Sequence, residues 1–412
     1  MSIDVKMAWR NIWRNPRRTI LTISAIAFAS LLLVFMLSFQ FGSYETMINS
    51  SVKIYTGHLQ VQAMEYQEIK KIRMVVPDPD VIDKILNQIQ SVEAYTSRAE
   101  AFSLVSSKKR TYGSIVIGID PVKEAKVSTL KSLMRKGSYL AKDDTGQVLI
   151  GNLLAKNLKV DIQDELTILG QGRDGSIAAT VVKVKGIYSS GIDDLDRSSI
   201  HMPLKYFQDV YGMYGAVHEV VVIGKSLKKT ERIKTALSAG IKKTDSKDQL
   251  VVLDWKELMP GLLQSIELDL ISGIIFYLFL ILVVAFSIMN TFLMAIFERT
   301  REFGVLMAIG TTPGRLTKLL LIESISMTMI GIVAGIIMGS LITLYFQGHG
   351  IEISGTSDLL SQYGISGLIY PRLSLLSALS GPGAVFIITF LAALYPALKI
   401  RSLRPVEAMT YV

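Results

Sequence analysis

The sequence contains no cysteine among its 412 residues. This absence excludes a disulfide framework, a thiolate metal site and a cysteine nucleophile, although it does not identify the compartment. Histidine is also scarce, and no pair of histidines has the spacing of metal ligands. The four are His58, His201, His218 and His349. Because neither H-E-x-x-H nor G-x-S-x-G occurs, we expect no metal site and no catalytic residues in this chain.

A nucleotide-binding loop is absent as well. The stretch VVIGKS resembles the end of a Walker A loop, but G-x-x-x-x-G-K-S needs glycine where this chain has Glu219. We interpret Gly224, Lys225 and Ser226 as the end of a strand followed by a helix cap. An acidic stretch brings together Asp193, Asp194 and Asp196. It lacks the EF-hand spacing and favours a solvated loop. We therefore expect no cofactor in this chain, and because it lacks a nucleotide-binding loop we expect any energy to come from a partner.

Long hydrophobic runs are what the sequence does have. Half of the residues are hydrophobic and the mean hydropathy is +0.39, which is high for a soluble protein but too low for one that is membrane throughout. Four runs are long enough to cross a bilayer: 20–41, 270–297, 319–346 and 377–398. The first resembles a signal peptide but is too long and lacks a nearby A-x-A-like cleavage site, so we expect a retained anchor. In the fourth, Gly381, Pro382 and Gly383 predict a helix that starts near Pro382, after a short helix or re-entrant turn.

Basic residues set the expected orientation of these runs. They gather before the first run, between the second and third, and after the fourth. By the positive-inside rule these segments, with both termini and the tail 399–412, are cytoplasmic. The segment 42–269 and the loop 347–376 are then outside, in a multi-pass protein of the cell inner membrane. This arrangement also explains the net charge of +9 without a nucleic-acid partner.

The segment 42–269 alternates polar helices with short β-branched runs. IYTGHLQVQA and GSIVIGID read as strands, and DPDVIDKILNQIQSV reads as a helix with Asp78 or Asp80 near its cap. The last part, from HEVVVIGKS to DQLVVLDW, makes a βαβ pattern. The stems GSYETMINSSVK and DWKELMPGLLQSIELD read as helical stalks. The predicted fold is therefore a membrane α-helical protein with four transmembrane helices and a large extracytoplasmic α+β domain, built from two lobes, between helices 1 and 2.

The segment 1–19 predicts an amphipathic helix. One stripe carries Val5, Trp9, Ile12 and Trp13, and the opposite face carries Arg10, Arg14 and Arg17. Tryptophan rings favour the headgroup level of a bilayer and arginines favour anionic lipid, so we expect this helix to lie on the membrane surface. A helix packed on a soluble core is the alternative.

Two further segments predict helix contacts. The link 298–318 begins with dense charge and should form a short helix that ends at Gly310, although an ordinary amphipathic loop helix has the same pattern. In the third run, Gly331, Gly335 and Gly339 are four residues apart on one helical face, where backbones can approach closely. The sequence leaves open whether this contact lies within the chain or with a second membrane protein of the same kind.

Several stretches carry a resemblance to a known family. ERTREFGVLMAIGTTPGRL, followed by Glu323, resembles the E-R-x-x-E-x-G-x-x-x-A-x-G signature of FtsX-like ABC transporter permeases. YPALKIRSLRPVEAM and WRNIWRNPRRT are similar to the two ends of the same family. VLIGNLLAKNLKVDIQDELTIL resembles part of the MacB-like periplasmic core domain, with one departure before Asp164, where relatives often have glycine. The layout is similar to that of lipoprotein-releasing permeases of the LolC and LolE type.

The resemblance implies that 298–318 is a coupling helix seated on a separate ABC ATPase. The implied coupling residues are Glu298, Arg299, Glu302, Gly304, Ala308 and Gly310. ATP and Mg would bind to two copies of that ATPase, and the permease would pair with a second permease, identical or homologous. The implied task is release of lipoproteins to a periplasmic carrier. Efflux of drugs, peptides or other amphiphiles in the MacB manner, with an adaptor, stays open, and so does FtsX-like signalling to a cell-wall hydrolase.

Overall fold

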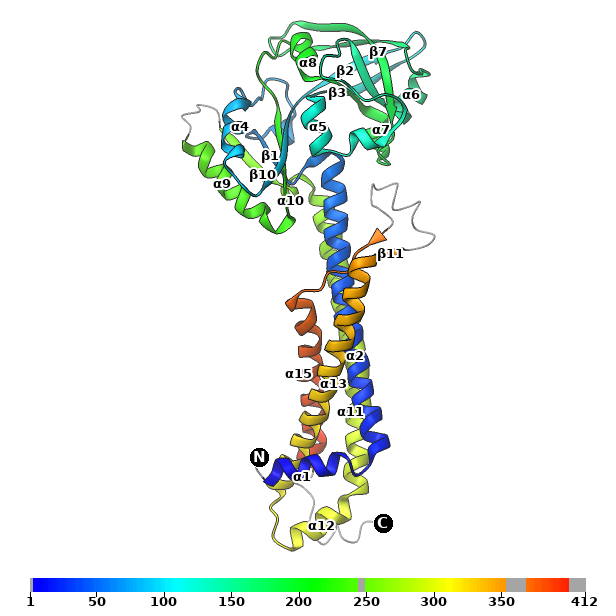
Figure 1. Cartoon of the computed structure of the whole chain (residues 1–412), viewed down its shortest axis with the longest axis vertical. Coiled ribbons are helices and arrows are strands. Elements are labelled where there is room, and N and C mark those ends of the chain that lie inside the picture. The colour runs from blue at the N-terminus through cyan, green and yellow to red at the C-terminus, as the bar shows by residue number, and fades with distance from the viewer. Residues whose placement is uncertain (1–2, 244–248, 353–367, 400–412) are drawn as a thin grey trace. The chain divides into compact units, whose positions relative to one another are not determined.

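The computed structural model describes residues 3–243, 249–352 and 368–399, which form two compact units (Figure 1). The first, here called the helical unit, contains residues 3–44, 266–352 and 368–399. The second, here called the α+β unit, contains residues 45–243 and 249–265. The α+β unit therefore lies in the sequence between the first and second long apolar helices, as the sequence predicts.

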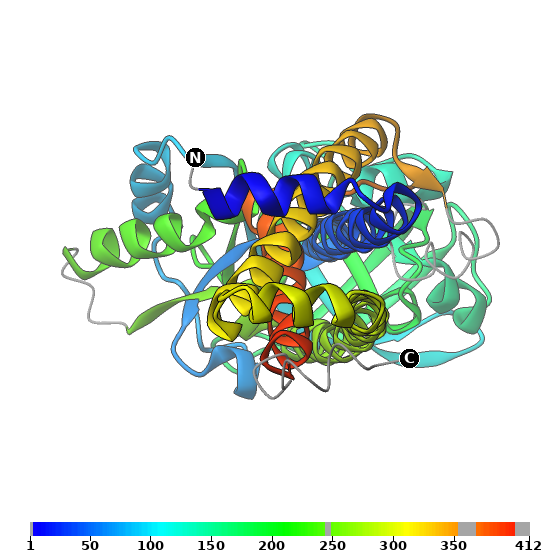
Figure 2. The same ribbon diagram turned by 90° about the horizontal axis from the view of Figure 1, so that it is seen from below.

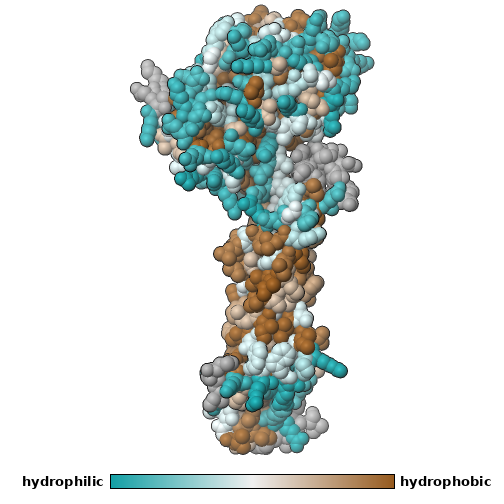
Figure 3. Space-filling view, in the orientation of Figure 1, coloured by the Kyte–Doolittle hydropathy of each residue, from teal (hydrophilic) through white to brown (hydrophobic). Residues whose placement is uncertain are grey.

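Four long helices make up most of the helical unit. They are α2 (Pro16–Ser51), α11 (Pro260–Glu298), α13 (Pro313–His349) and α15 (Leu375–Lys399). All four are long and apolar enough to cross a membrane, and each covers one predicted span. Ile26 of α2, Ile288 of α11, Ile332 of α13 and Val385 of α15 meet in a buried core. Apolar side chains also cover the outside of the middle of these helices, as Figure 3 shows for one face, which is typical of contact with lipid.

Two short helices lie at the same end of the helical unit. Figure 1 shows α1 (Ile3–Ile12) and α12 (Thr300–Ala308) there, and Figure 2 shows α1 running across the end of α13. At the other end of α13, β11 (Ile351–Glu352) pairs with β12 (Leu368–Ile369) in antiparallel fashion. Within the predicted loop 347–376, residues 353–367 lie outside the described part of the chain, and so does the predicted tail beyond Lys399.

The fourth apolar helix begins earlier than predicted. α15 starts at Leu375 and continues through Pro382, so between residue 368, where the described chain resumes, and that proline there is no separate helix or re-entrant turn. A cap explains the start, because Ser374 Oγ accepts a hydrogen bond from the Ser377 amide at 3.1 Å and Ser377 Oγ accepts one from the Ser374 amide at 3.0 Å. Pro382 is buried among neighbouring helices, where a transmembrane helix tolerates the hydrogen bond that proline removes.

A mixed ten-stranded sheet forms the α+β unit. Its strands follow the order β10-β1-β9-β2-β3-β8-β5-β7-β4, and β6 pairs with β2 and β7. The bounds are β1 (Leu59–Ala63), β2 (Val92–Ser106), β3 (Thr111–Ile119), β4 (Met134–Gly137), β5 (Gln147–Gly151), β6 (Glu165–Gln171), β7 (Ile177–Tyr188), β8 (Ser199–Pro203), β9 (Glu219–Gly224) and β10 (Leu250–Asp254). β9 and β10 are both antiparallel to β1 and so parallel to each other, with α9 (Thr230–Lys243) between them in sequence. This confirms the predicted βαβ pattern.

The two largest hydrophobic cores of this unit share the sheet. One lies between α6 (Asn152–Leu158), α8 (Leu204–Tyr211) and the strands around β5 and β7. The other lies between α4 (Pro79–Asn87), α9 and the strands β1, β9 and β10. α4 is capped by Asp78, whose carboxylate accepts a hydrogen bond from the Asp80 amide at 3.2 Å. The two cores correspond to the two predicted lobes.

Two local predictions in this unit are wrong. The stretch Val52–Thr56 continues α2 as one turn of π-helix, and β1 begins only at Leu59, after Gly57 turns the chain with a φ of 74°. The acidic stretch is not a solvated loop, because Asp193–Ser198 forms the short helix α7 and Asp196 is 3% exposed. Its carboxylate accepts hydrogen bonds from the amide and the hydroxyl of Ser190 at 2.8 and 2.7 Å, so it has a structural role in closing the turn.

Candidate functional site

The coupling segment forms a separate short helix, α12, between α11 and α13. α11 ends at Glu298, and Arg299 interrupts the helix with φ −106° and ψ 6°. At the other end, Gly310 has a φ of 99°, which a residue with a Cβ rarely adopts. The Thr311 amide then donates to the Leu306 carbonyl at 2.9 Å and closes the turn. The structure therefore confirms that the helix ends at Gly310.

One face of α12 is buried against its two neighbouring helices. Phe303 is 1% exposed and Met307 is 9% exposed. They pack with Ile296 of α11 and with Leu316 and Leu320 of α13. Gly304 is also buried on this side, whereas Gly310 is exposed at the end of the helix.

The opposite face of α12 carries apolar side chains that no other described residue covers. Val305 is 50% exposed and Ile309 is 75% exposed, and Arg301 and Ala308 are exposed beside them. Their spacing of four, seven and eight residues from Arg301 places them in one stripe. We call these four residues the exposed stripe. Sequence reasoning missed Val305 and Ile309, although the run GVLMAI is too continuously apolar for one buried face.

An ion-pair network connects α12 to the segment after α1. Nη1 and Nη2 of Arg14 both donate to the carboxylate of Glu302, with Nη1 to Oε2 at 3.0 Å. Arg299 Nε also donates to Glu302, at 3.4 Å. The hydrogen bond from Arg14 lowers the pKa of Glu302, against a smaller opposite effect of partial burial, so this carboxylate is ionised at neutral pH.

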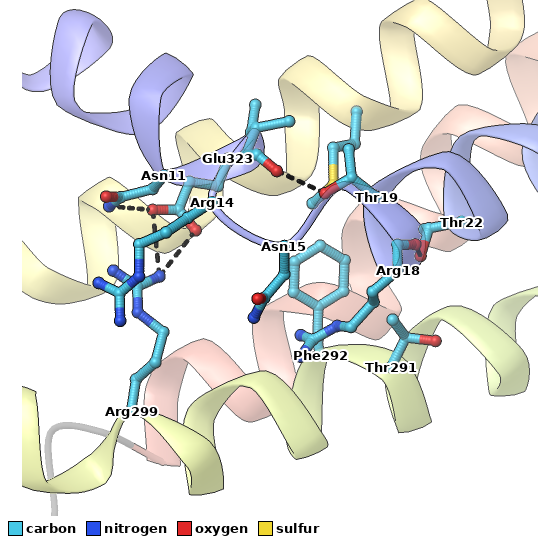
Figure 4. Close-up of a pocket in the computed structure, with 12 residues that line it drawn as sticks. Asn11, Arg14, Asn15, Arg18, Thr19, Thr22, Thr291, Phe292, Arg299 and Glu323 are labelled. Carbon is cyan, nitrogen blue, oxygen red and sulfur yellow. Dashed lines mark hydrogen bonds and ion pairs between the residues drawn. The ribbon is translucent and has the colours of Figure 1, made fainter.

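A second carboxylate, Glu323, connects α1 to α13. It is 6% exposed. It lies near the start of the range predicted as the third span, so that span contains an acidic residue close to one end. Asn11 Nδ2 donates to Glu323 Oε1 at 2.6 Å, and Arg299 Nη1 donates to its two oxygens at 3.3 and 3.5 Å. Figure 4 shows these side chains around a shared pocket, with Arg14 and Arg18 beside them.

Two further sets of ion pairs fix the same end of the helical unit. Arg18, in the first turn of α2, donates to Glu298 at the end of α11 at 3.0 Å. Asp4 of α1 pairs with Arg315 at 3.2 Å and with Lys318 at 3.6 Å. Three of the predicted coupling residues, Glu298, Arg299 and Glu302, therefore make ion pairs of this network. Gly304 is buried on α12, whereas Ala308 and Gly310 are exposed and make no ion pair.

The predicted stripe of α1 divides in two. Trp9 and Trp13 are each 47% exposed, with ring centroids 6.2 Å apart, and Arg10 and Arg17 are exposed as well. Ile12 does not share that exposure, because it is 3% exposed and is buried where α1 packs on α13. Arg14 was predicted to face anionic lipid but pairs with Glu302 instead. The reason is that a fixed carboxylate in the same chain offers bidentate geometry.

The three glycines of the third span all face α2. A Cβ on Gly335 would lie 2.5 Å from both the Ala27 carbonyl oxygen and Ser30 Cβ. A Cβ on Gly331 would lie 2.7 Å from Ile26 Cβ, and one on Gly339 would lie 3.1 Å from the Leu31 carbonyl oxygen. The close helix contact is therefore made within this chain, between α2 and α13.

The remaining candidates have structural roles. Among the described residues, no group of three or more His, Cys, Asp or Glu side chains is arranged to hold a metal ion. His58 Nδ1 accepts a hydrogen bond from the Gly224 amide at 3.1 Å, and the Lys225 amide donates to the Ser91 carbonyl at 3.0 Å. These amides are therefore occupied within the sheet and do not form a phosphate-binding loop.

Comparison with known proteins agrees with this architecture. The model of the MacB-like periplasmic core domain matches residues 19–239, and the model of the FtsX-like permease C-terminal domain matches residues 274–405. The lipoprotein-releasing system transmembrane protein LolC of Neisseria meningitidis is 22% identical over 75% of this chain and 76% of its own length. The macrolide export ATP-binding/permease protein MacB of Chlorobaculum tepidum is 34% identical over 30% of this chain and 17% of its own length.

Among solved structures, the periplasmic region of MacB from Actinobacillus actinomycetemcomitans covers 52% of this chain and 94% of its own, with a TM-score of 0.38 and 13% identity. The two family models lie in the order of the two units, because the core-domain model ends inside α9 and the permease model begins inside α11. The core-domain match alone spans more than half of the chain. The chain belongs to the family of FtsX-like permeases that carry a MacB-like periplasmic core domain.

Proposed function

We propose that this chain is the permease subunit of an ABC transporter in the cell inner membrane, and that it docks a separate ATPase, present in two copies, through α12. The observation that carries this proposal is the division of α12 into an anchored face and the exposed stripe. Phe303 and Met307 fix the helix to α11 and α13, while Val305 and Ile309 stay open to a partner. An exposed apolar stripe beside charged residues is typical of a protein contact surface.

The six residues of the family motif divide between two roles in this proposal. Ala308 belongs to the exposed stripe and Gly310 is exposed beside it, so both would touch the ATPase directly. Glu298, Arg299 and Glu302 would act through their ion pairs with the rest of the helical unit. Gly304 is buried and would let α12 lie close to its neighbours. ATP and Mg would bind to the ATPase and not to this chain.

The favoured cargo is a lipoprotein released from the inner membrane to a periplasmic carrier. Support comes from the LolC relatives, because their similarity extends over three quarters of both chains. Efflux of a drug, peptide or other amphiphile is the second candidate, supported by the higher local identity to MacB. A second permease, identical or homologous, would complete the transporter, and the exposed apolar sides of the long helices would contact membrane lipid.

The orientation can be tested independently of the cargo. The distribution of basic residues supports an orientation with both termini and α12 in the cytoplasm and the α+β unit in the periplasm. Fusions of a topology reporter after Lys142 and after Val412 are expected to give opposite readings. Matching readings would contradict this orientation and with it the docking role of α12.

Docking itself is tested by substitutions on the exposed stripe. Val305→Asp and Ile309→Asp each place a charge on an exposed apolar site, so we expect at least a tenfold loss of the ABC ATPase that co-purifies with the chain, measured by quantitative mass spectrometry. Val181→Asp is the matched control, because Val181 is 58% exposed but lies on β7 of the α+β unit. Wild-type recovery of the ATPase with both α12 variants would overturn the docking proposal.

The motif carboxylate gives a second test of the same proposal. Glu302→Lys and Gly304→Val are expected to reduce either docking or the ATP hydrolysis of the docked ATPase, while membrane insertion is unchanged. Asp194→Asn, on the exposed start of α7, serves as the control outside the helical unit. If both variants match wild type in docking and in hydrolysis, α12 is an ordinary helix between two spans.

A further inference from the structure

We propose that α1 and the start of α2 are working parts of the coupling apparatus, and that Arg14 is the positioning residue that transmits displacement of α12 to α2. This inference rests on the proposed function, because it needs an ATPase that moves α12. It goes further in naming the path by which the movement leaves α12 and the side chains that carry it.

The apolar face of α12 accounts for only part of that path. Phe303 and Met307 pack on α11 and α13, so movement of α12 reaches those two helices by direct contact. The backbone joints at each end are not helical, since Arg299 and Gly310 both leave the α-helical region. A direct connection between α12 and α2 therefore has to come from side chains.

Ion pairs supply this connection. Arg14 lies in the turn between α1 and α2, and its Nη1 and Nη2 atoms both donate to Glu302 of α12. Arg18, on the first turn of α2, holds Glu298 immediately before α12. From this point α2 continues as one helix to Ser51. The pairs thus connect both ends of the α11–α12 junction to the base of the helix that leads into the inserted domain.

α1 gives this connection a fixed base. Ala8 and Ile12 are buried where α1 packs on α13, and Asn11 donates to the buried Glu323 of α13 at 2.6 Å. Thr19 Oγ1 donates to the Ile12 carbonyl across the turn and so fixes the start of α2 relative to α1. Because α1 is anchored on α13, a pull on Arg14 acts on the turn between α1 and α2 instead of dragging a free N-terminal segment.

The contact has the exposure expected of one that is made and broken during a cycle. The side chains of Arg14 and Glu302 are 55% and 42% exposed, so water can replace either partner at low cost. Glu323, by contrast, is 8% exposed at its side chain and pairs with Arg299 at 3.3 Å. We therefore assign the Arg14–Glu302 pair to transmission and the Asn11–Glu323–Arg299 cluster to the fixed support.

The test uses the natural absence of cysteine in this chain. Spin labels are placed on cysteines at Leu21 of α2 and Ile387 of α15, which are 71% and 60% exposed, and the distance between them is measured by double electron–electron resonance in the complex with its co-purified ATPase. We expect trapping of the ATPase with ADP and vanadate to change this distance. Arg14→Glu is expected to reduce the change by at least half while the amount of bound ATPase stays within twofold of wild type.

Charge reversal of both partners separates transmission from folding. The double variant Arg14→Glu with Glu302→Arg restores an ion pair, so we expect most of the distance change to return. Arg10→Glu is the matched control, because Arg10 is exposed on α1 and has no carboxylate partner among the described residues. If Arg14→Glu does not insert into the membrane, Arg14→Gln replaces it, with the same expectation for the distance.

The possible failures are distinguishable. If the wild-type chain binds no ATPase, the proposed function fails and this inference fails with it. If the ATPase binds but trapping leaves the distance between Leu21 and Ile387 unchanged in wild type, or changes it equally in wild type and Arg14→Glu, only the inference is overturned.

Discussion

The two units each contain an arginine that holds a glutamate with two guanidinium nitrogens, but in opposite surroundings. In the α+β unit, Arg98 of β2 donates to Glu124 of α5 (Pro121–Val127) at 2.7 and 3.0 Å, and the two side chains are 0% and 2% exposed. In the helical unit, Arg14 and Glu302 are 55% and 42% exposed. The same kind of ion pair is therefore fully buried in the α+β unit and largely exposed to solvent in the helical unit. We call the first the sealed pair and the second the open pair.

The difference teaches that burial decides what such a pair can do. Burial alone raises the pKa of Glu124, but the charge and hydrogen bonds of Arg98 outweigh it and hold the pKa below its usual value. Breaking that pair strands a charge in the interior, so it cannot open during a cycle. Water and salt readily replace either partner of the Arg14 pair. The sealed pair suits a rigid domain, and the open pair suits a moving joint.

The largest effect is expected from breaking the sealed pair. Arg98→Met should lower the free energy of unfolding of the α+β unit by about 3–5 kcal/mol, because it leaves Glu124 buried without a partner. The measurement is urea unfolding of the full chain followed by Trp255 fluorescence in a Trp9→Phe and Trp13→Phe background. Adding Glu124→Leu should recover most of the loss. A loss below about 1 kcal/mol for the single variant would contradict the comparison.

Glu323 tests the middle of the range of burial. Glu323→Gln keeps the contact with Asn11 but removes the charge that faces Arg299. We therefore expect the free energy needed to detach α1 from α13 to fall by about 1–3 kcal/mol. Detachment is followed on heating in non-ionic detergent by the fluorescence of Trp9 and Trp13, with Trp255 replaced by Phe. Glu352→Gln, on the exposed β11, is the matched control and should change nothing. Equal behaviour of the two variants would remove Glu323 from the support of α1.

A pair of carboxylates in the α+β unit adds a titration to the comparison. Glu100 and Glu219 are 9% and 1% exposed and share Lys70, whose Nζ lies 3.4 and 3.3 Å from them. Burial, and then the charge of Glu100, raise the pKa of Glu219 to about 7. Glu219 therefore contributes fully to stability when the pH is below the ordinary pKa of a glutamate, and this contribution is lost as the pH rises through about 7.

The buried histidines act in the opposite direction. Burial lowers the pKa of His58, His201 and His218 to about 4. Their contribution to stability is therefore present when the pH is above the ordinary pKa of histidine, and it is lost as the pH falls towards 4. A comparison of Glu219→Gln with wild type cancels the effect of the histidines, because both proteins contain them. Between pH 6.5 and 8, the free energy of unfolding of Glu219→Gln should rise by about 1 kcal/mol relative to wild type. A difference independent of pH would show that Glu219 does not titrate in this range.

Local signals in the sequence were enough to predict several elements. The cap at Asp78, the end of α12 at Gly310 and the four apolar helices follow from residues that lie within a few positions of each feature. The strand β2 could not be predicted in this way. Its fifteen residues, Val92–Ser106, include helix-favouring Glu and Ala, and pairing with β3, β6 and β9 determines its conformation.

The departure from the family pattern before Asp164 has a physical consequence. Gln163 adopts a φ of 70°, a conformation that favours glycine, and glycine is the residue that the resemblance to the family implies before Asp164. The family pattern therefore marked a real backbone requirement that this chain meets with a less suitable residue. The ion pairs of the candidate site gave no comparable signal, because Arg14 and Glu302 are separated by 288 positions and only the fold brings them together.

The smallest expected effect on stability comes from the open pair, and its salt dependence distinguishes it from the sealed one. Arg14→Gln should lower the free energy that holds α1 in place by at most about 1 kcal/mol at low salt, because both side chains of the pair are already largely solvated. In 1 M NaCl, where the Debye length falls to about 3 Å, the difference from wild type should disappear. Trp9 and Trp13 fluorescence on heating in non-ionic detergent, at 50 mM and 1 M NaCl, measures it. The loss caused by Arg98→Met should be the same at both salt concentrations, since no ion reaches the buried Glu124. An Arg14→Gln effect that is large and independent of salt would show that this contact is as sealed as the one in the α+β unit, and would leave no room for it to open during transport.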